Sequence, residues 1–418
     1  MRINCILEES KDMALIVQKY GGSSVADAEK IRNVARRIAA TKDKGNQVVV
    51  AVSAMGDTTD ELINLAYQIN DHPDGRELDA LVSTGELVSS TLLAMALEAM
   101  GYEAISLSGA QAGIRTDSAH RRARILNVEP KRIRRELENG NVVIVAGFQG
   151  ITEDMDVTTL GRGASDITAL ALAASLEAEI CERYTDVEGV YTADPRIVPE
   201  ARQLTEISYE EMLELSAQGT KVMQPRSVEL GELYNIPILV ASSFTDNPGT
   251  LIHGGVSMEV RNKVRGIAHD LDVAKVTVVG VPDRPGIAAA IFEPLAAANI
   301  SVDTIVQNAS IDNITDLTFT VTREQLGEVM RVIKPIAAEI GARECVSDAS
   351  LGKVSIVGTG MLNMPGFAAR MFSALSEKGI NIQLISTSEI RITCIIDETK
   401  VKDAVRALHR VFELDVGD

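Results

Sequence analysis

The alternation of short apolar runs with amphipathic stretches over the first 250 residues restricts the fold more than any other feature. Six runs rich in Val, Ile and Leu have the length of buried strands: residues 14–20, 47–55, 102–109, 141–150, 179–186 and 237–243. Between them, segments such as 25–42 and 58–70 repeat apolar residues at helical spacing. Strands that alternate with helices form a mainly parallel sheet with helices on both faces, and ligands bind where its strands end. We therefore predict a mainly parallel α/β three-layer sandwich.

The composition is that of a globular protein with two or three domains. Of the 418 residues, 45% are hydrophobic, and with no Trp the cores must consist largely of Ala, Val, Ile and Leu. The net charge of −18 argues against nucleic acid or an anionic membrane as a partner, because phosphate contacts need clustered Lys and Arg. No apolar run approaches the roughly 18 residues of a membrane span. We expect a cytoplasmic protein.

Cysteine and histidine are placed in ways that predict no metal centre. The four cysteines form no CxxC pair and the five histidines do not cluster. Residues 1–12 (MRINCILEESKD) lack the basic start and apolar centre of a signal peptide. Because a strand-like run follows Met13 directly, we expect deletion of this extension to leave activity and melting temperature nearly unchanged.

The last third of the chain contains an internal repeat. A turn-rich stretch near 246–272 breaks the earlier rhythm, and we assign 251–272 to a linker. Residues 276–305 and 354–385 then match at a constant offset of 80 positions, including a Pro-Gly pair in each copy. Each copy reads as a ferredoxin-like βαββαβ unit, which predicts two such domains at 273–345 and 352–416.

Two glycine-containing turns are candidate anion sites. KYGGSS follows the first strand, where Lys19, Gly21 and Gly22 could present an ammonium and main-chain N–H groups to a phosphate. LGRGASD (160–166) precedes an apolar helix whose amino terminus would also favour an anion. On local grounds each motif fits a plain turn and helix cap as well.

Further polar residues lie in loops and at helix starts. TDVEGVYTADPR (185–196) could hold a nucleotide, and GTKVMQPRS (219–227) offers Lys221. In SAMGDTTDEL (53–62), Thr58 and Glu61 have the spacing of a capping box, which leaves Thr59 free. Glu86 falls where a helix begins, and a carboxylate there is favourable in any protein.

These motifs occur together, in an order and at spacings that resemble aspartate kinase, a family with the amino-acid kinase fold. The resemblance covers nearly the whole chain from Met13, and TADPR and GRGxSD are its most specific parts. It implies a catalytic domain at 13–250 and regulatory ACT domains in the two repeats. The implied reaction is phosphorylation of L-aspartate by MgATP to 4-phospho-L-aspartate, the first step toward lysine, threonine and methionine.

The resemblance also implies roles for individual residues. Lys19 and Asp166 would be catalytic. The nucleotide would be held by Lys19, Tyr20, Gly21, Gly22, Thr185, Asp186, Tyr191, Arg196 and Lys221. Aspartate would be held by Thr59, Glu86, Arg162, Gly163, Ala164 and Ser165. Glu86 would face its ammonium, and Arg162 would bind a carboxylate with two hydrogen bonds.

The implied chemistry explains this set of residues. A carboxylate nucleophile is already ionised at neutral pH, so no general base is required. The barrier is the approach of an anion to a polyanion, so positioning and charge neutralisation should carry catalysis. Asp166 then orients Lys19 rather than accepting a proton. Ala164 departs from the family motif, which has a second glycine there, and would be strained if its φ were positive.

The resemblance further implies that lysine, threonine or both inhibit the enzyme between ACT domains. The contacts would be Asp283, Ala288, Gln307, Asn381 and Ile382. Pairing of such sheets across chains would give a homo-oligomer, or a hetero-oligomer if Met258 is an internal start. Two alternatives stay open: a catalytically weak amino-acid sensor, and a kinase for another amino-acid carboxylate.

Overall fold

The computed structural model describes residues 13–161, 163–255, 264–308, 313–361 and 364–416. The chain forms two compact units. The first contains the described residues of 1–190, 203–216 and 221–256, and the second those of 191–202, 217–220 and 257–418. Two short segments of the expected catalytic domain therefore belong to the second unit.

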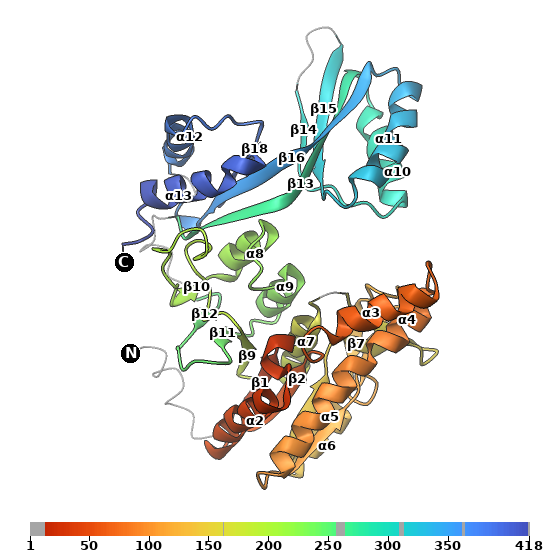
Figure 1. Cartoon of the computed structure of the whole chain (residues 1–418), viewed down its shortest axis with the longest axis vertical. Helices are drawn as coiled ribbons and strands as arrows, with labels where there is room; N and C mark the ends of the chain where they lie inside the picture. Colours follow the sequence, from red (N-terminus) through yellow and green to blue (C-terminus); the bar gives the residue numbers. More distant parts are fainter. Residues whose placement is uncertain (1–12, 162, 256–263, 309–312, 362–363, 417–418) are drawn as a thin grey trace. The chain divides into compact units, whose positions relative to one another are not determined.

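An eight-stranded sheet forms the centre of the first unit (Figure 1). Its order is β10 (Glu206–Ile207), β12 (Thr250–Ile252), β11 (Ile238–Ser242), β9 (Ile180–Thr185), β1 (Leu15–Tyr20), β2 (Gln47–Val52), β6 (Val142–Ala146) and β3 (Ala104–Leu107). Every pairing is parallel except that of β11 with β12. The predicted mainly parallel sheet is confirmed, and each of the six predicted runs contributes a strand to it.

Helices cover both faces of this sheet. Apolar residues of α2 (Ala28–Asp43) and α5 (Thr84–Glu98) share a core with alternate residues of β2 and with Tyr20. On the other face, α7 (Ser165–Leu176) packs against β1, β2 and β9, and α9 (Pro225–Leu233) packs on α7. Ten of the twelve residues of α7 are buried, so this helix lies within the core and holds its first turn firmly against the sheet.

The remaining elements of the first unit lie around this sandwich. The helices are α3 (Thr58–Ile69), α4 (Gly75–Val82), α6 (Lys131–Glu138) and α8 (Tyr209–Ala217). A four-stranded sheet that sequence analysis did not predict has the order β5 (Ile125–Val128), β4 (Ile114–Thr116), β7 (Gln149–Ile151) and β8 (Val157–Thr159). Among the described residues, the stretch Gly75–Glu98 is long and apolar enough to cross a membrane, and half of its most apolar window is buried in the protein.

The second unit contains one six-stranded sheet. Its order is β14 (Ile305–Gln307), β15 (Ile314–Val321), β13 (Gly266–Pro282), β16 (Glu344–Val357), β18 (Arg391–Asp397) and β17 (Leu384–Thr387). The long strands β13 and β16 run through both repeats (Figure 1). Helices α10 (Ile287–Ala297) and α11 (Leu326–Glu339) cover one end, and α12 (Phe367–Glu377) and α13 (Val401–Val411) cover the other.

The two repeats match where the sequence matches. Both first helices begin directly after a glycine with positive φ, Gly286 at 90° and Gly366 at 107°, a conformation that favours glycine. The first repeat has the predicted βαββαβ order, from β13 to β16.

The second repeat departs from the prediction. It ends at α13, and its fourth strand is the beginning of β13, where residues 266–270 pair antiparallel with 353–357 of β16. The expected linker 251–272 is therefore wrong over its last residues, because they form a strand. Pairing with a distant segment, which local turn propensity cannot reveal, stabilises that strand.

Candidate functional site

The loop after β1 is packed closely against the loop after β2. A Cβ atom on Gly22 would lie 2.8 Å from the carbonyl oxygen of Ala54 and 3.0 Å from that of Gly56, so the close approach requires glycine. The amide of Gly21 donates to the Tyr184 carbonyl at 3.3 Å. The predicted phosphate loop is thus held between two neighbouring strand ends.

Lys19 and Asp166, predicted to act together, form a buried ion pair. Lys19 Nζ lies 2.7 Å from Asp166 Oδ1, and their side chains are 7% and 5% exposed. A third residue that sequence analysis missed, Arg183 of β9, donates from Nε to Asp166 Oδ2 at 2.9 Å. Burial opposes ionisation of Asp166, but Arg183 and Lys19 outweigh it and hold its pKa below the ordinary value. Burial also lowers the pKa of Lys19, with Asp166 opposing that shift.

Glu86 is a second buried carboxylate, in the first turn of α5. Its Oε1 accepts from the Ala54 amide at 3.3 Å, whereas its Oε2 has no hydrogen-bond partner among the described residues. Burial raises the pKa of Glu86 to about 7. A buried carboxylate without a counter-charge favours the binding of a cationic group, such as an ammonium, next to it.

The glycine-rich turn before α7 is only partly described, because Arg162 lies outside the described residues. Gly161 and Gly163 have positive φ values of 97° and 72°. Ala164 has φ −79° and is fully buried, so the strain considered for it does not arise. Ser165 packs against the end of β6, since a Cβ atom on Gly147 would lie 2.9 Å from its Oγ.

The predicted capping box at Thr58 is wrong. Thr58 is the first residue of α3, and its hydroxyl donates to the Met55 carbonyl at 2.7 Å instead of capping the helix. The turn before the helix supplies a carbonyl acceptor, and threonine hydroxyls bond readily to such local carbonyls. Thr59, the predicted substrate contact, is half-buried in the first turn.

Thr185, at the end of β9, is tied to the phosphate loop by a residue that sequence analysis also missed. Ser243 donates from its amide to the Thr185 carbonyl at 2.8 Å, and its hydroxyl lies 2.8 Å from that of Ser24 in the KYGGSS loop. Thr185 Oγ1 in turn donates to the exposed Asp186 at 2.9 Å. The ends of β1, β9 and β11 are thereby fixed to one another.

Tyr20 is the one predicted nucleotide residue of this loop whose side chain points away from it. Its ring is fully buried and stacked on that of Tyr184, with centroids 5.0 Å apart, on the sheet face covered by α2. Its carbonyl accepts from the Ser53 amide at 3.1 Å, so Tyr20 holds the loop against β2.

The other predicted nucleotide residues divide between the two units. Lys221 is exposed in the first unit. Tyr191 and Arg196 belong to the second, where Arg196 forms an ion pair with Asp194 at 2.8 Å. The sequence pattern did not predict that these residues belong to different units.

The five predicted effector residues all lie in the second unit. Asp283, Ala288 and Gln307 belong to the first repeat and Asn381 and Ile382 to the second. Three of the five are exposed: Asp283 just after β13, Gln307 on the edge strand β14, and Asn381 between α12 and β17. Asn363, the counterpart of Asp283, lies outside the described residues, as does Met258.

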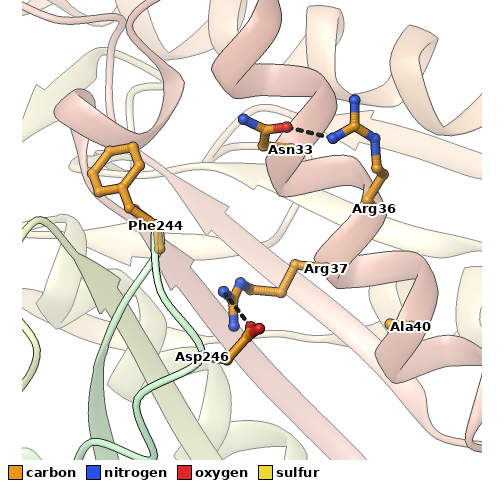
Figure 2. Close-up of a pocket in the computed structure, with 7 residues that line it drawn as sticks. Asn33, Arg36, Arg37, Ala40, Phe244 and Asp246 are labelled. Atoms are coloured by element: carbon orange, nitrogen blue, oxygen red, sulfur yellow. Dashed lines mark hydrogen bonds and ion pairs between the residues drawn. The ribbon is translucent and has the colours of Figure 1, made fainter.

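A separate pocket of about 470 Å³ lies between α2 and the loop after β11. Figure 2 shows Arg37 extending from α2 toward Asp246, and Phe244 beside them. Arg37 also lies over the Tyr184 ring, 4.9 Å from its centroid. Across the described ranges, no group of three or more His, Cys, Asp or Glu side chains could hold a metal ion.

Comparison with known proteins gives the family. The amino acid kinase family matches residues 14–242, and ACT domains match 275–338 and 354–412. An aspartokinase of Mycolicibacterium smegmatis is 51% identical over 97% of this chain and 98% of its own. Aspartokinase III of E. coli in complex with aspartate and ADP is 25% identical, with a TM-score of 0.80 over 96% of this chain and all of that one. Its complex with lysine and aspartate has a TM-score of 0.72 at the same identity, over 95% and 99%.

The match to the Mycolicibacterium smegmatis protein covers 97% of this chain, and family models match both kinds of domain. The buried Lys19–Asp166 pair lies beside the glycine loop in the part of the chain that the amino acid kinase family matches. The chain belongs to the amino acid kinase family and, within it, to the aspartokinases.

Proposed function

We propose that this aspartokinase transfers the γ-phosphoryl group of ATP to the side-chain carboxylate of L-aspartate at the ends of β1, β2 and β9. The observation that carries the assignment is the placement of opposite buried charges in this region. The Lys19–Asp166 pair lies at the glycine loop, and the unpaired Glu86 is hydrogen-bonded to the loop that packs on Gly22. Phosphate suits the first position and an ammonium the second.

In this proposal the aspartate carboxylate attacks the γ-phosphorus in line with the leaving ADP. The carboxylate is ionised before it binds, so no residue removes a proton. Lys19 and Lys221 neutralise phosphate charge, and Asp166 orients Lys19. The glycine loop at Gly21 and Gly22 holds the phosphates, and Thr185 and Asp186, in the same unit, contact the rest of the nucleotide.

We propose that Mg²⁺ enters the site with ATP. Mg²⁺ in kinases is commonly held by substrate phosphates and few protein ligands. The ion would neutralise charge on the phosphates during transfer.

The acceptor end would hold aspartate by both of its charged groups. Glu86 accepts from the ammonium, and Arg162 binds a carboxylate. Thr59 and the turn Gly163–Ser165 make the remaining contacts with aspartate. Ala164 is buried and lines the site at this turn. A longer acceptor such as glutamate would displace either the ammonium or the reacting carboxylate from its partner.

The test is turnover of MgATP with aspartate, with glutamate and without an acceptor, with hydroxylamine present to trap acyl phosphate. We expect aspartyl hydroxamate from aspartate alone. Glutamyl hydroxamate in equal amount would favour a kinase for another carboxylate. ADP release without an acceptor, or no ADP at all, would favour the catalytically weak sensor.

We further propose that lysine, threonine or both inhibit the enzyme through the ACT domains, as the lysine complex of aspartokinase III suggests. Asp283 is the charged acceptor suited to the effector ammonium. Asp283→Ala should abolish inhibition and leave uninhibited turnover unchanged, whereas Asn363→Ala should do much less. Full inhibition of Asp283→Ala by both amino acids would contradict this site.

The edge strands of the second unit support assembly of the cytoplasmic protein into oligomers. Ile305 on β14 and Ile385 on β17 occupy matching repeat positions and are 54% and 44% exposed. Exposed apolar edge strands are suited to pairing with a second chain. Sedimentation should therefore show at least a dimer, and mass spectrometry should show whether translation from Met258 adds a shorter subunit.

A further inference from the structure

Arg183 lies beside Lys19 on the same face of the central sheet, although no motif marks it. The two residues are direct partners in the parallel register of β9 with β1. Side chains at paired positions of neighbouring strands project to the same face. On the opposite face, Glu182 is hydrogen-bonded to Gln18 and Tyr184. The topology therefore brings a second cation to the level of Lys19.

Asp166 is shared between these two cations. Lys19 approaches one carboxylate oxygen at 2.7 Å and Arg183 donates to the other at 2.9 Å. With side chains 7%, 5% and 12% exposed, the three form a buried cluster with two positive charges and one negative. An unbalanced buried charge is costly. The cluster is therefore built to receive an anion, within a chain of net charge −18.

Arg183 also carries a donor that is not used. Its Nη1 is buried and has no hydrogen-bond partner among the described residues. A guanidinium cannot lose its proton in a protein, so the donor persists. Cys181, two residues earlier on the same face, supplies no negative charge, because burial raises the pKa of its thiol. A bound acceptor would recover the free energy lost at Nη1.

We propose that Arg183 is a further catalytic residue, whose Nη1 donates to the phosphoryl group in transfer while Asp166 holds Arg183 and Lys19 in place. The inference rests on the proposed roles of Lys19 and Asp166. In the step, an aspartate carboxylate oxygen bonds to the γ-phosphorus, the bond to the β,γ-bridging oxygen breaks, and ADP leaves with the electron pair. No proton moves, so Arg183 acts by neutralising charge and orienting the group.

The competing explanation is that Arg183 only holds Asp166. Lysine at this position would keep the pairing with Asp166, but its single nitrogen could not also place a donor where Nη1 lies. A purely structural role therefore predicts a normal kcat for Arg183→Lys. A catalytic role predicts that it is not.

The experiment compares Arg183→Leu and Arg183→Lys with Arg37→Leu, in the full chain. Arg37 is a matched control, because it is a partly buried arginine that contacts β9 from the opposite face, over Tyr184. We expect Arg183→Leu to lower kcat about 100-fold while KM for aspartate changes by less than about threefold. Arg183→Lys should stay at least about tenfold slow, and Arg37→Leu should keep normal turnover.

Binding supplies a readout that does not depend on turnover. Affinity for ADP alone should be nearly unchanged in both Arg183 variants, whereas affinity for ADP with aluminium fluoride and aspartate should fall by the same factor as kcat. Equal losses for both ligands, normal kcat in Arg183→Leu, or full activity of Arg183→Lys would overturn the proposal. If Arg183→Leu does not fold, the Arg183→Lys comparison decides. Absence of aspartyl hydroxamate with the unmodified protein would instead overturn the proposed function, and the binding comparison would still judge Arg183.

Discussion

Asp166 and Glu86 are two buried carboxylates in the first turns of two helices, and they differ in the charge that each favours beside it. Each lies in the first turn, Asp166 in α7 and Glu86 in α5, and they are 4% and 3% exposed. The pKa of Asp166 is held below its ordinary value, whereas that of Glu86 is raised to about 7.

The difference comes from neighbours rather than from burial or the helix. Both groups are desolvated, but Asp166 has two cations at its oxygens, whereas Glu86 has only main-chain amides, among them that of Ala54 at 3.3 Å. Groups of one kind whose surroundings push their pKa values apart take different parts in a reaction. Here the Asp166 region carries excess positive charge and suits phosphate, and the Glu86 region lacks a cation and suits an ammonium.

The largest expected effect is that of Asp166→Asn. The change leaves Lys19 and Arg183 buried without a counter-charge, so they repel each other and lose their orientation. We expect kcat to fall about 1,000-fold and the melting temperature to fall as well. Steady-state kinetics and a thermal melt measure both. A kcat within about tenfold of normal would show that the shared carboxylate is not needed for orientation.

Glu86→Gln should act on aspartate rather than on chemistry. It removes the charge that pairs with the ammonium, so we expect KM for aspartate to rise about 100-fold with KM for ATP nearly unchanged. Glu182→Gln is the matched control, because Glu182 is a half-buried carboxylate hydrogen-bonded by Gln18 and Tyr184. Similar changes in both variants would indicate a general effect of removing a buried charge.

Arg162→Ala should have a smaller effect of the same kind. Loss of one carboxylate contact is expected to raise KM for aspartate at least about tenfold, and KM for ATP much less. Initial rates with each substrate varied in turn measure the split. Equal increases for both substrates would place Arg162 outside the aspartate end.

Sequence analysis found the residues that stand in glycine-rich or capping contexts and missed those that depend on register. Lys19 and Asp166 were predicted as a pair, and the structure brings them within 2.7 Å. Arg183 lies in an ordinary strand sequence, and its position beside Lys19 follows only from the pairing of β9 with β1. Alternation along 179–186 could have placed it on a face, but not beside Lys19.

The fold shows the same limit. Local patterns predicted the alternating strands and helices of the parallel sheet and both Pro-Gly helix starts, since each of these elements is marked by neighbouring residues. The strand formed by residues 266–270 was read as linker, because its partner lies at 353–357. Thr58 was predicted to cap the helix because residue spacing does not show that its hydroxyl donates to the Met55 carbonyl instead.

The most direct test of the opposed charge preferences is proton release when aspartate binds, measured calorimetrically in buffers of different ionisation enthalpy with a nonhydrolysable ATP analogue present. An ammonium needs Glu86 ionised, and below its pKa of about 7 the free protein holds the proton. With that pKa, aspartate should release about 0.9 proton at pH 6 and about 0.1 at pH 8, and Glu86→Gln should release none from this site. No release at pH 6, or the same release from Glu86→Gln, would contradict the account.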